Sequence, residues 1–440
     1  NERHGERAIP RHGRLGLAPH PGATEHLESR RTGPVKQPYR FASTSVIMAL
    51  GSMVSLAAQA LVGVAMLHFF TPQAAGGFAI TAQVAFFWVS LSLAQGPLQF
   101  LADAHHPPRA ALRAVLRSSL WRWLGLAPLV ALAVWWSAMA TPFTLLGWAA
   151  LLALLQLAWY LAQPWTLRTA SPLSAALVRA GPPVVALVLT VTAARAWPAE
   201  SPHGLLLAAA CGYAVGALWL RSARLEGHTT QPPQQHAPEP PAATAQADRR
   251  STSLRLAHTA IDAIAGTALL LVWQRLHGLA DASYLAMLLR LLGFIPAVVH
   301  TAWAQVLLAR VETAQWRSLA VGLGAAAAAA LAGWVGFLVL DATSLATAWQ
   351  GMRPYLLPLV LWQGSACISA ALSHRPFQHA QERQYSWLAM ALQALQLVVL
   401  VAPLWAPQGW SAEVHLWWLA GTSAIGLLVL SAWMLALPRR

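Results

Sequence analysis

Long apolar runs separated by short polar segments make up most of the chain. A helix that crosses a hydrocarbon layer of about 30 Å needs roughly 20 mostly apolar residues. By this criterion the pattern predicts about twelve membrane-spanning helices. The predicted spans are residues 44–69, 76–96, 118–138, 142–163, 173–194, 203–220, 254–273, 282–308, 318–340, 355–373, 385–404 and 414–437. The pattern therefore predicts an all-α, polytopic membrane protein.

Two polar segments interrupt or precede these runs. Residues 1–40 are rich in Arg, His, Pro and Gly and have no apolar core, so we predict a disordered basic tail. Residues 223–252 are rich in Pro and Gln, which predicts a flexible linker. The linker divides the spans into a first six-helix lobe, residues 41–222, and a second, residues 253–440. Six spans plus six is the arrangement of transporters built from two repeats.

The composition agrees with a membrane protein and sets its orientation. Of the 440 residues, 57% are hydrophobic and only 10% are charged, whereas soluble domains carry about 25% charged residues. The net charge is +14, but the basic residues do not gather on one surface, so no nucleic-acid partner is expected. They concentrate in alternate loops. The positive-inside rule then predicts that the N-terminus, the linker and the C-terminus are cytoplasmic.

Enzymatic chemistry finds little support in the sequence. Cys211 and Cys367 both lie inside apolar runs, so they build neither a disulfide framework nor a metal site. No glycine-rich nucleotide-binding loop is present. The predicted external loops are too short to carry the acid, base and phosphate-binding groups of a glycan polymerase or ligase. We therefore expect no enzyme and no cofactor, but a secondary transporter or flippase.

Two arginines fall inside predicted spans, where a charge costs at least about 2.5 to 3.5 kcal/mol. Arg290 lies well inside the eighth span, before Pro296, whose ring should kink the helix. It either lines a substrate cavity or fixes packing by pairing with a neighbouring helix. Arg179 precedes Pro182 and Pro183, which we expect to break the fifth span. It either lines the cavity or extends toward the cytoplasmic head groups.

The seventh span carries Arg255, His258 and Asp262, whose spacing places all three on one helical face. Asp262 with a neighbouring histidine could carry protons or bind sodium. The alternative is a structural salt bridge from Asp262 to Arg290 or Arg179. Other polar side chains in the spans either hydrogen-bond a sugar or join helices: Gln59, Gln83, Gln305, Gln393, Gln396 and His300.

Six plus six spans also describe the major facilitator superfamily, but the loop after the second span lacks that family's glycine, acidic and paired-basic signature. Two other stretches resemble polysaccharide (O-antigen type) flippases of the multidrug, oligosaccharidyl-lipid and polysaccharide exporter superfamily. Residues 69–81, FFTPQAAGGFAIT, resemble the turn and the Gly-aromatic entry into that family's second span. Residues 278–311 resemble its eighth span, with an external turn, an aromatic, Arg and Pro.

The resemblance implies two six-helix lobes around a central cavity that opens alternately to either side of the bacterial inner membrane. The implied cargo is an undecaprenyl-diphosphate-linked oligosaccharide for lipopolysaccharide or exopolysaccharide synthesis. Arg290 and Arg179 would attract the diphosphate, with polar side chains around the sugars. The first span carries no arginine, unlike the lipid II flippase branch, which disfavours that activity.

Three functions therefore stay open. The leading hypothesis is a flippase for a lipid-linked oligosaccharide, in contact with membrane lipids and working beside a polysaccharide polymerase and glycosyltransferases. The second is a cation-coupled small-molecule exporter with Asp262 as its coupling carboxylate. The third is a membrane scaffold of a polysaccharide assembly complex that transports nothing.

Overall fold

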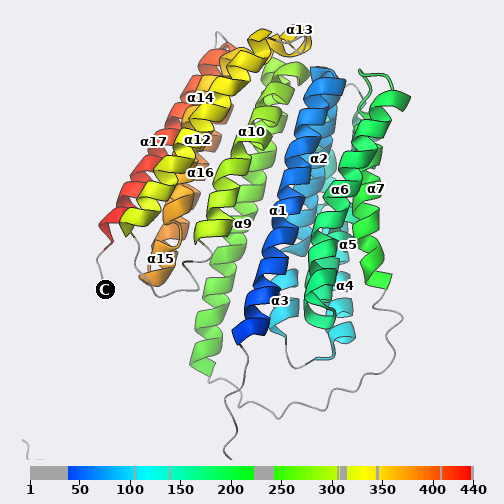
Figure 1. The fold of residues 1–440 in the computed structure, drawn as a ribbon, viewed down its shortest axis with the longest axis vertical. Coiled ribbons are helices and arrows are strands. Elements are labelled where there is room, and N and C mark those ends of the chain that lie inside the picture. Colours follow the sequence, from blue (N-terminus) through cyan, green and yellow to red (C-terminus); the bar gives the residue numbers. More distant parts are fainter. Residues whose placement is uncertain are drawn as a thin grey trace, which may run out of the picture. The chain divides into compact units, whose positions relative to one another are not determined.

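The computed structural model describes residues 38–103, 106–137, 139, 141–221, 242–304, 307, 315–342, 346–406 and 409–437. Most of the predicted tail and residues 223–241 of the predicted linker lie outside the described residues. Residues 44–440 form one compact unit. Within the described residues this unit contains twelve helices that are long and apolar enough to cross a membrane, which confirms the predicted fold class (Figure 1).

The helices of the first half are α1 (Pro38–Phe69), α2 (Pro72–Leu93), α3 (Gly96–Ala102), α4 (Pro108–Trp136), α5 (Pro142–Thr169), α6 (Pro172–Ala196), α7 (His203–Leu218) and η1 (Trp219–Arg221). Those of the second half are α9 (Ala242–His277), α10 (Leu279–Val299), the π-helical η2 (His300–Ala304), α12 (Gln315–Ala342), α13 (Ala346–Trp349), η3 (Gln350–Met352), α14 (Arg353–Leu372), α15 (Arg375–Gln378), α16 (Glu382–Val401), η4 (Ala402–Leu404) and α17 (Ala412–Ala436).

Two helices begin ten or more residues before their predicted starts, at 108 instead of 118 and at 242 instead of 254. Helix α4 begins at Pro108, so Arg109, Arg113 and Arg117 lie on its first turns and not in a loop. Helix α9 begins at Ala242, inside the stretch predicted as linker. Both extensions are polar, and a polar helical turn outside the hydrocarbon layer leaves no trace in a criterion that counts apolar residues.

Several helices start where the sequence has a cap followed by proline. Thr71 caps α2 and Ser171 caps α6, each through its side-chain oxygen, and proline comes next in both. The first helical N–H has no partner in the helix, so proline costs nothing there. These Thr-Pro and Ser-Pro pairs set the entry points of α2 and α6.

The same packing order recurs in the two halves. In the first half α2 packs on α5, α5 packs on α7, and α7 packs on α6; in the second, α10 packs on α14, α14 on α17, and α17 on α16. A duplicated six-helix unit would produce this recurrence, although the division into two lobes stays a prediction. Helix α2 also packs on α9 and α10, and one cluster of buried apolar side chains includes residues of both halves.

Small residues allow the helices to approach closely. In α12, whose Gly- and Ala-rich sequence predicts close packing, a Cβ added at Gly322 would lie 2.8 Å from the Cα of Ile368, and one at Gly333 would lie 2.3 Å from Val360. Both neighbours belong to α14. Apolar surface gains little by leaving lipid, so such contacts carry much of the helix association.

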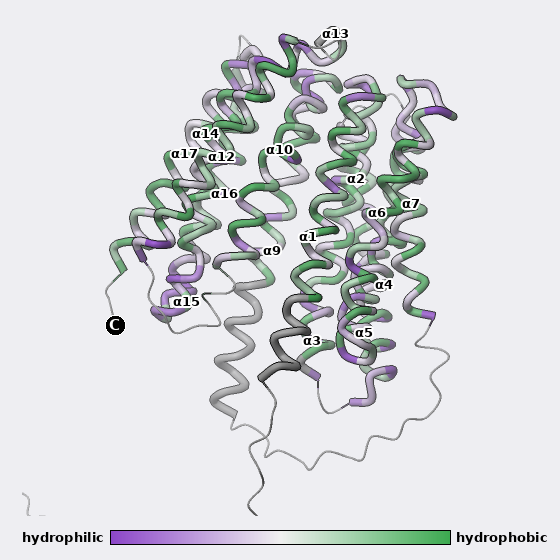
Figure 2. Tube along the Cα trace, viewed as in Figure 1, coloured by the Kyte–Doolittle hydropathy of each residue, from purple (hydrophilic) through white to green (hydrophobic). Residues whose placement is uncertain are grey.

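Hydrophobic residues follow the bodies of the helices, and hydrophilic ones gather toward their ends (Figure 2). The lower end in Figure 1 holds α3 and α15. We call it the basic end, because Arg375 begins α15, Arg168 contacts Phe100 of α3, and α4 and α12 carry Arg113 and Arg317 near their starts. The opposite end, which we call the far end, carries Asp281, Asp341, Glu200 and Glu413.

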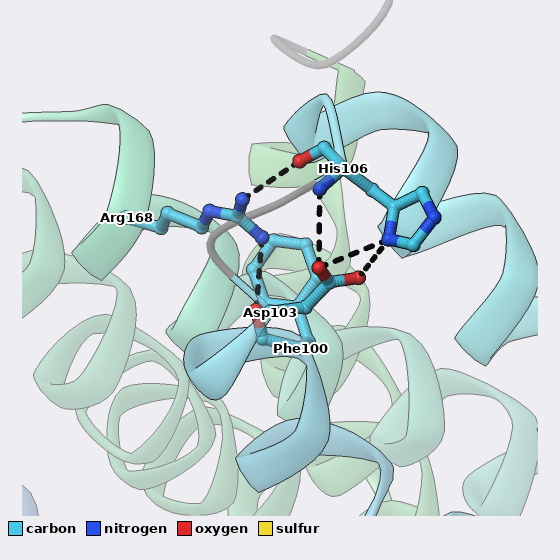
Figure 3. Close-up of polar contacts among 4 residues, drawn as sticks. All are labelled: Phe100, Asp103, His106 and Arg168. Carbon is cyan, nitrogen blue, oxygen red and sulfur yellow. Dashed lines mark hydrogen bonds and ion pairs between the residues drawn. The ribbon is translucent and has the colours of Figure 1, made fainter. Parts of the chain in front are cut away.

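At the basic end Arg168 joins α5 to the segment between α3 and α4 (Figure 3). Its guanidinium donates to the carbonyl oxygens of Phe100 and His106, at 2.9 Å each, and lies over the Phe100 ring. Asp103 accepts hydrogen bonds from the backbone and the ring of His106. This arginine therefore has a structural role in the first half.

Candidate functional site

A cavity of about 530 Å³ lies among helices of both halves. Helices α1, α2, α5, α6 and α7 contribute its wall from the first half, and α9 and α10 contribute it from the second. The polar lining residues are Gln59, Gln83, Gln156, Tyr160, Thr190, Tyr213 and Arg290. Arg290 is the one charged side chain among the described lining residues. The cavity thus offers amides, hydroxyls, aromatic rings and a single positive charge.

Arg290 reaches this cavity from the middle of α10. Its Nη1 lies 3.8 Å from the Sδ atom of Met66 in α1, a weak contact. Within the described part of the chain it forms no ion pair with a carboxylate. Tyr213 of α7 is close enough to interact electrostatically with the guanidinium. The positive charge at this cavity is therefore not neutralised by a described side chain.

Gly63 of α1 lies against the aliphatic part of the Arg290 side chain. A Cβ at Gly63 would lie 3.8 Å from Cδ of Arg290 and 3.2 Å from the side chain of Leu291. Because glycine has no side chain, Gly63 leaves room for the aliphatic part of Arg290. It also brings α1 close to α10 at the depth of the charge.

Three stacked aromatic rings form the first-half side of the cavity. Trp159 stacks on Tyr160 with 5.2 Å between centroids and on Tyr213 with 5.4 Å. The Nε2 atom of Gln156 donates to the Tyr160 hydroxyl at 3.1 Å. Two aromatic side chains thus come from α5 and one from α7. They present ring surface and hydroxyl groups to the cavity.

The proline pair beside this stack does not break α6, contrary to our expectation. The helix runs without interruption from Pro172 to Ala196 through Pro182 and Pro183. Pro182 has no N–H for the carbonyl four residues earlier, which belongs to Val178. The indole Nε1 of Trp159 donates to that carbonyl at 2.7 Å. A neighbouring helix therefore satisfies the carbonyl that proline leaves free, as membrane helices allow.

A second cavity, of about 240 Å³, adjoins the first. The two share Gln83, Phe86, Gly266 and Leu269 in their walls. Asp262 of α9 lines the second cavity, together with Gln393 and Gln396 of α16. The Nε2 atom of Gln393 donates to the Asp262 carboxylate at 2.8 Å. The predicted aspartate therefore borders a cavity of its own, next to that of Arg290.

The alternative salt bridge of Asp262 does not occur among the described residues, since neither Arg290 nor Arg179 pairs with it. Arg179 lines neither cavity and donates to the hydroxyl of Ser52 in α1 at 2.9 Å. The structure thus places the two predicted cavity arginines in different surroundings. Arg290 faces the cavity, whereas Arg179 joins α6 to α1.

The other predicted site residues divide in the same way. Gln59 and Gln83 line the larger cavity. His300 lies at the basic end, with its Nδ1 atom 3.1 Å from the hydroxyl of Ser373, and His258 lines neither cavity. Gln305 lies outside the described residues, as does the side chain of Arg255.

Four polar lining residues from α5, α6 and α7 were not predicted from the sequence: Gln156, Tyr160, Thr190 and Tyr213. Gln156 is a polar residue deep in a predicted span, which is the signal by which other glutamines were selected. The two tyrosines could not be separated by sequence from interfacial aromatics. Among the described residues no group of three or more His, Cys, Asp or Glu could hold a metal ion.

No protein-family model matches the chain, and no curated protein matches it either. Among solved structures, the lipid II flippase MurJ in an inward closed conformation matches with a TM-score of 0.62 at 10% identity, over 88% of this chain and 86% of that one. A chain described as protein A matches with a TM-score of 0.52 at 10% identity, over 92% and 97%. An inward-facing multidrug resistance MATE family transporter of the MOP superfamily reaches 0.49 at 14% identity, over 88% and 93%. At such identities the likeness shows the fold alone, and the fold of this chain is similar to that of the lipid II flippase MurJ.

Proposed function

We propose that the chain is a transporter that flips an undecaprenyl-diphosphate-linked oligosaccharide across the bacterial inner membrane for surface polysaccharide synthesis. The observation that carries the proposal is the charge of the larger cavity. Its described lining contains Arg290 and no carboxylate. An unneutralised guanidinium attracts a diphosphate and repels a cation. The sign of the charge therefore favours an anionic cargo over a cationic drug.

The rest of the lining suits a sugar. Amide groups of Gln59, Gln83 and Gln156 can donate to and accept from hydroxyl groups. The rings of Tyr160 and Tyr213 offer apolar faces beside phenolic hydroxyls. Arg290 and the aromatic side chains lie in opposite halves of the chain, so the diphosphate and the glycan would contact different halves.

The lipid tail needs no place in this cavity. Arg290 lies beside Gly63, where α1 and α10 approach each other. We infer that the tail of a cargo bound at Arg290 stays in the bilayer outside the cavity. None of the described lining residues from α1, α2, α5, α6 and α7 is an arginine or a lysine. A cargo with a single diphosphate therefore fits better than one with further anionic groups.

Asp262 favours a second candidate, a cation-coupled small-molecule exporter. Its carboxylate lines the adjoining cavity, and the Oε1 atom of the neighbouring Gln393 is buried without a hydrogen-bond partner among the described residues. Two oxygen groups of this kind can bind a small cation. In a flippase the same pair would serve the coupling ion.

The test is complementation of glycan export in a host strain that lacks the gene. We expect Arg290→Ala to reduce the exported glycan at least tenfold, a loss of about 1.4 kcal/mol or more in binding. Arg290→Lys should retain part of the activity, since a lysine keeps the charge but not the bidentate geometry. Extracted surface polysaccharide is the readout, at matched protein levels in the membrane.

The control is Arg195→Ala, which removes an exposed arginine at the far end of α6. Full export by Arg290→Ala would contradict the proposal. If Asp262→Asn abolishes drug efflux while glycan export stays normal, the chain is an exporter. A scaffold that transports nothing would tolerate the changes at Arg290, Arg179 and Asp262 alike.

A further inference from the structure

A pair of histidines joins two helices at the far end of the second half. His277 ends α9, and His415 lies in the second turn of α17. The Nε2 atom of His277 lies 2.9 Å from Nδ1 of His415. His415 is 0% exposed, whereas His277 is partly buried. Neither residue lines the cavities of the candidate site.

The surroundings of His415 keep water away from one side of the pair. Trp273 of α9 stacks on its ring with 4.6 Å between centroids, and Trp410 meets the ring edge-on at 5.8 Å. The Nε2 atom of His415 is buried and has no hydrogen-bond partner among the described residues. The backbone carbonyls of Val399 and Leu400 lie near the same ring. They belong to the last turn of α16, where carbonyl groups lack partners within the helix.

One carboxylate lies near the pair, whose burial works against a positive charge on either ring. Asp281 of α10 is close enough to interact electrostatically with His277. Its carboxylate accepts a hydrogen bond of 2.6 Å from the hydroxyl of Tyr355 in α14. Tyr284, which packs against Tyr355, is the other titratable group from α10 on this side.

The remaining charges at this end are directed elsewhere. Arg275 of α9 donates to the carbonyl of Trp136 in α4 and lies over its ring. Arg353 of α14 pairs with Asp341 at 3.2 Å. Glu413 of α17 is exposed. Among these groups, Asp281 is the one whose charge acts on the histidine pair.

We propose that His277 and His415 form a proton-binding site that ties α9, α16 and α17 together at the far end. In the neutral pair one imidazole N–H donates to the nitrogen of the other ring. A proton from water adds to the remaining free nitrogen and makes one ring an imidazolium. Where neutral His415 carries its proton on Nδ1 and donates to His277, the added proton goes to Nε2, which then donates toward the α16 carbonyls as well.

A second proton has the opposite effect. With both rings charged, two N–H donors face each other at the 2.9 Å contact, and no lone pair remains between them. Like charges at this distance repel, so the contact between α9 and α17 opens. The pair therefore takes up its two protons in coupled steps. The first strengthens the link between the helices and the second breaks it.

Proton binding stands independently of the cargo, whereas its use in transport rests on the proposed function. Helices α10 and α14 begin at the same end and hold Asp281 and Tyr355. Helix α10 also carries Arg290. The number of protons bound to the pair would thus change how far the second half closes around the cavity at its far end.

The test is ¹⁵N NMR of the full chain labelled at histidine, in detergent micelles, between about pH 3 and pH 8, a range that extends below the ordinary titration of histidine because the pair is buried. The variants are His277→Gln and His415→Gln. The control is His203→Gln, a histidine near Trp148 at the far end of the first half. We expect two ring signals to shift together with pH in the wild type and the control. Each variant should lose one of them and change the midpoint of the other.

Ring signals of His277 and His415 that do not change over this range would overturn the proposal, and so would two signals that titrate independently. Each variant assigns one of the two signals and leaves the other to be followed, so a single folded variant is enough for this answer. The outcome of Arg290→Ala does not affect these spectra, so failure of the proposed function is distinguishable from failure of the proton site.

A distance measurement tests the mechanical consequence. Spin labels at Glu200→Cys and Glu413→Cys, in a chain with Cys211→Ser and Cys367→Ala, report on the separation of the two halves at the far end. We expect the distance distribution to shift on acidification and the shift to be lost in the His277→Gln, His415→Gln double variant. The same shift in the double variant would show that the pair is only a structural link.

Discussion

At the scale of single residues, the side chains around the larger cavity depend on unusual hydrogen-bond partners. Trp159 donates to Val178, whose carbonyl is left free because Pro182 has no N–H. The indole is thereby fixed between Tyr160 and Tyr213. A proline in one helix thus determines where an aromatic ring of another helix lies.

Trp159→Phe should lower the free energy of unfolding by about 1–3 kcal/mol, because it leaves the Val178 carbonyl buried without a donor. In a Pro182→Ala background the cost should be smaller, since the alanine N–H can bond to that carbonyl. Denaturant titrations in detergent, followed by circular dichroism, give both values. Trp135→Phe, at an exposed position of α4, is the control. An equal cost in both backgrounds would contradict this account.

At the scale of helices, close contacts through small residues set how the two halves meet. Gly76, in the second turn of α2, lies against the start of α10. A Cβ at Gly76 would come within 2.5 Å of the Leu279 carbonyl oxygen. Gly278, with φ of +96°, turns the chain from α9 into α10 just before this contact. Both glycines therefore shape the junction at the far end.

Gly76→Ala should destabilise the protein by about 1–3 kcal/mol, because a backbone oxygen cannot move aside as a side chain can. Gly421→Ala is the matched control, since a Cβ there meets nothing within 4 Å. We expect that substitution to be neutral or to stabilise α17 by up to about 1 kcal/mol. Midpoints of thermal unfolding in one detergent compare the two. A midpoint that is unchanged by Gly76→Ala would mean that α2 and α10 approach less closely.

At the scale of the whole molecule, the two cavities meet at the boundary between halves. Gln83 of α2 and Gly266 of α9 belong to both walls. The amide of Gln83 also donates to Thr267 of α9 at 3.4 Å. A cargo group at Arg290 and an ion at Asp262 would therefore occupy neighbouring spaces on the two sides of this contact.

Gly266→Phe should reduce glycan export at least tenfold, because the ring would fill the space that the cavities share. The nearest atom to a Cβ there is the flexible amide of Gln83, at 3.3 Å, so folding should be retained. Gly324→Phe, on a face of α12 with nothing within 4 Å, is the control. Normal export by Gly266→Phe, at normal protein levels, would rule out the shared space as part of the transport path.

The sequence predicted the spans and three polar residues of the larger cavity, but not its tyrosines, its threonine or Gln156. Arg290, Gln59 and Gln83 were selected because a polar group in a hydrocarbon layer is costly and has to be satisfied. The same argument selected Arg179, which bonds to Ser52 instead of lining the cavity. The free-energy cost of a polar group in the hydrocarbon layer identifies which residues need a partner. It does not say whether that partner is a cargo or another helix.

The sequence by itself determined the number of membrane-spanning helices and where their apolar segments lie, since crossing a hydrocarbon layer requires about 20 apolar residues per helix whatever the neighbours are. The tertiary structure alone decided which helix faces meet. Lipid is as apolar as a protein core, so a membrane span is hydrophobic on all sides and its periodicity does not mark an inward face. Only packing therefore brought Tyr213 of α7 to Arg290 of α10, and separated that arginine from Arg179 and Asp262.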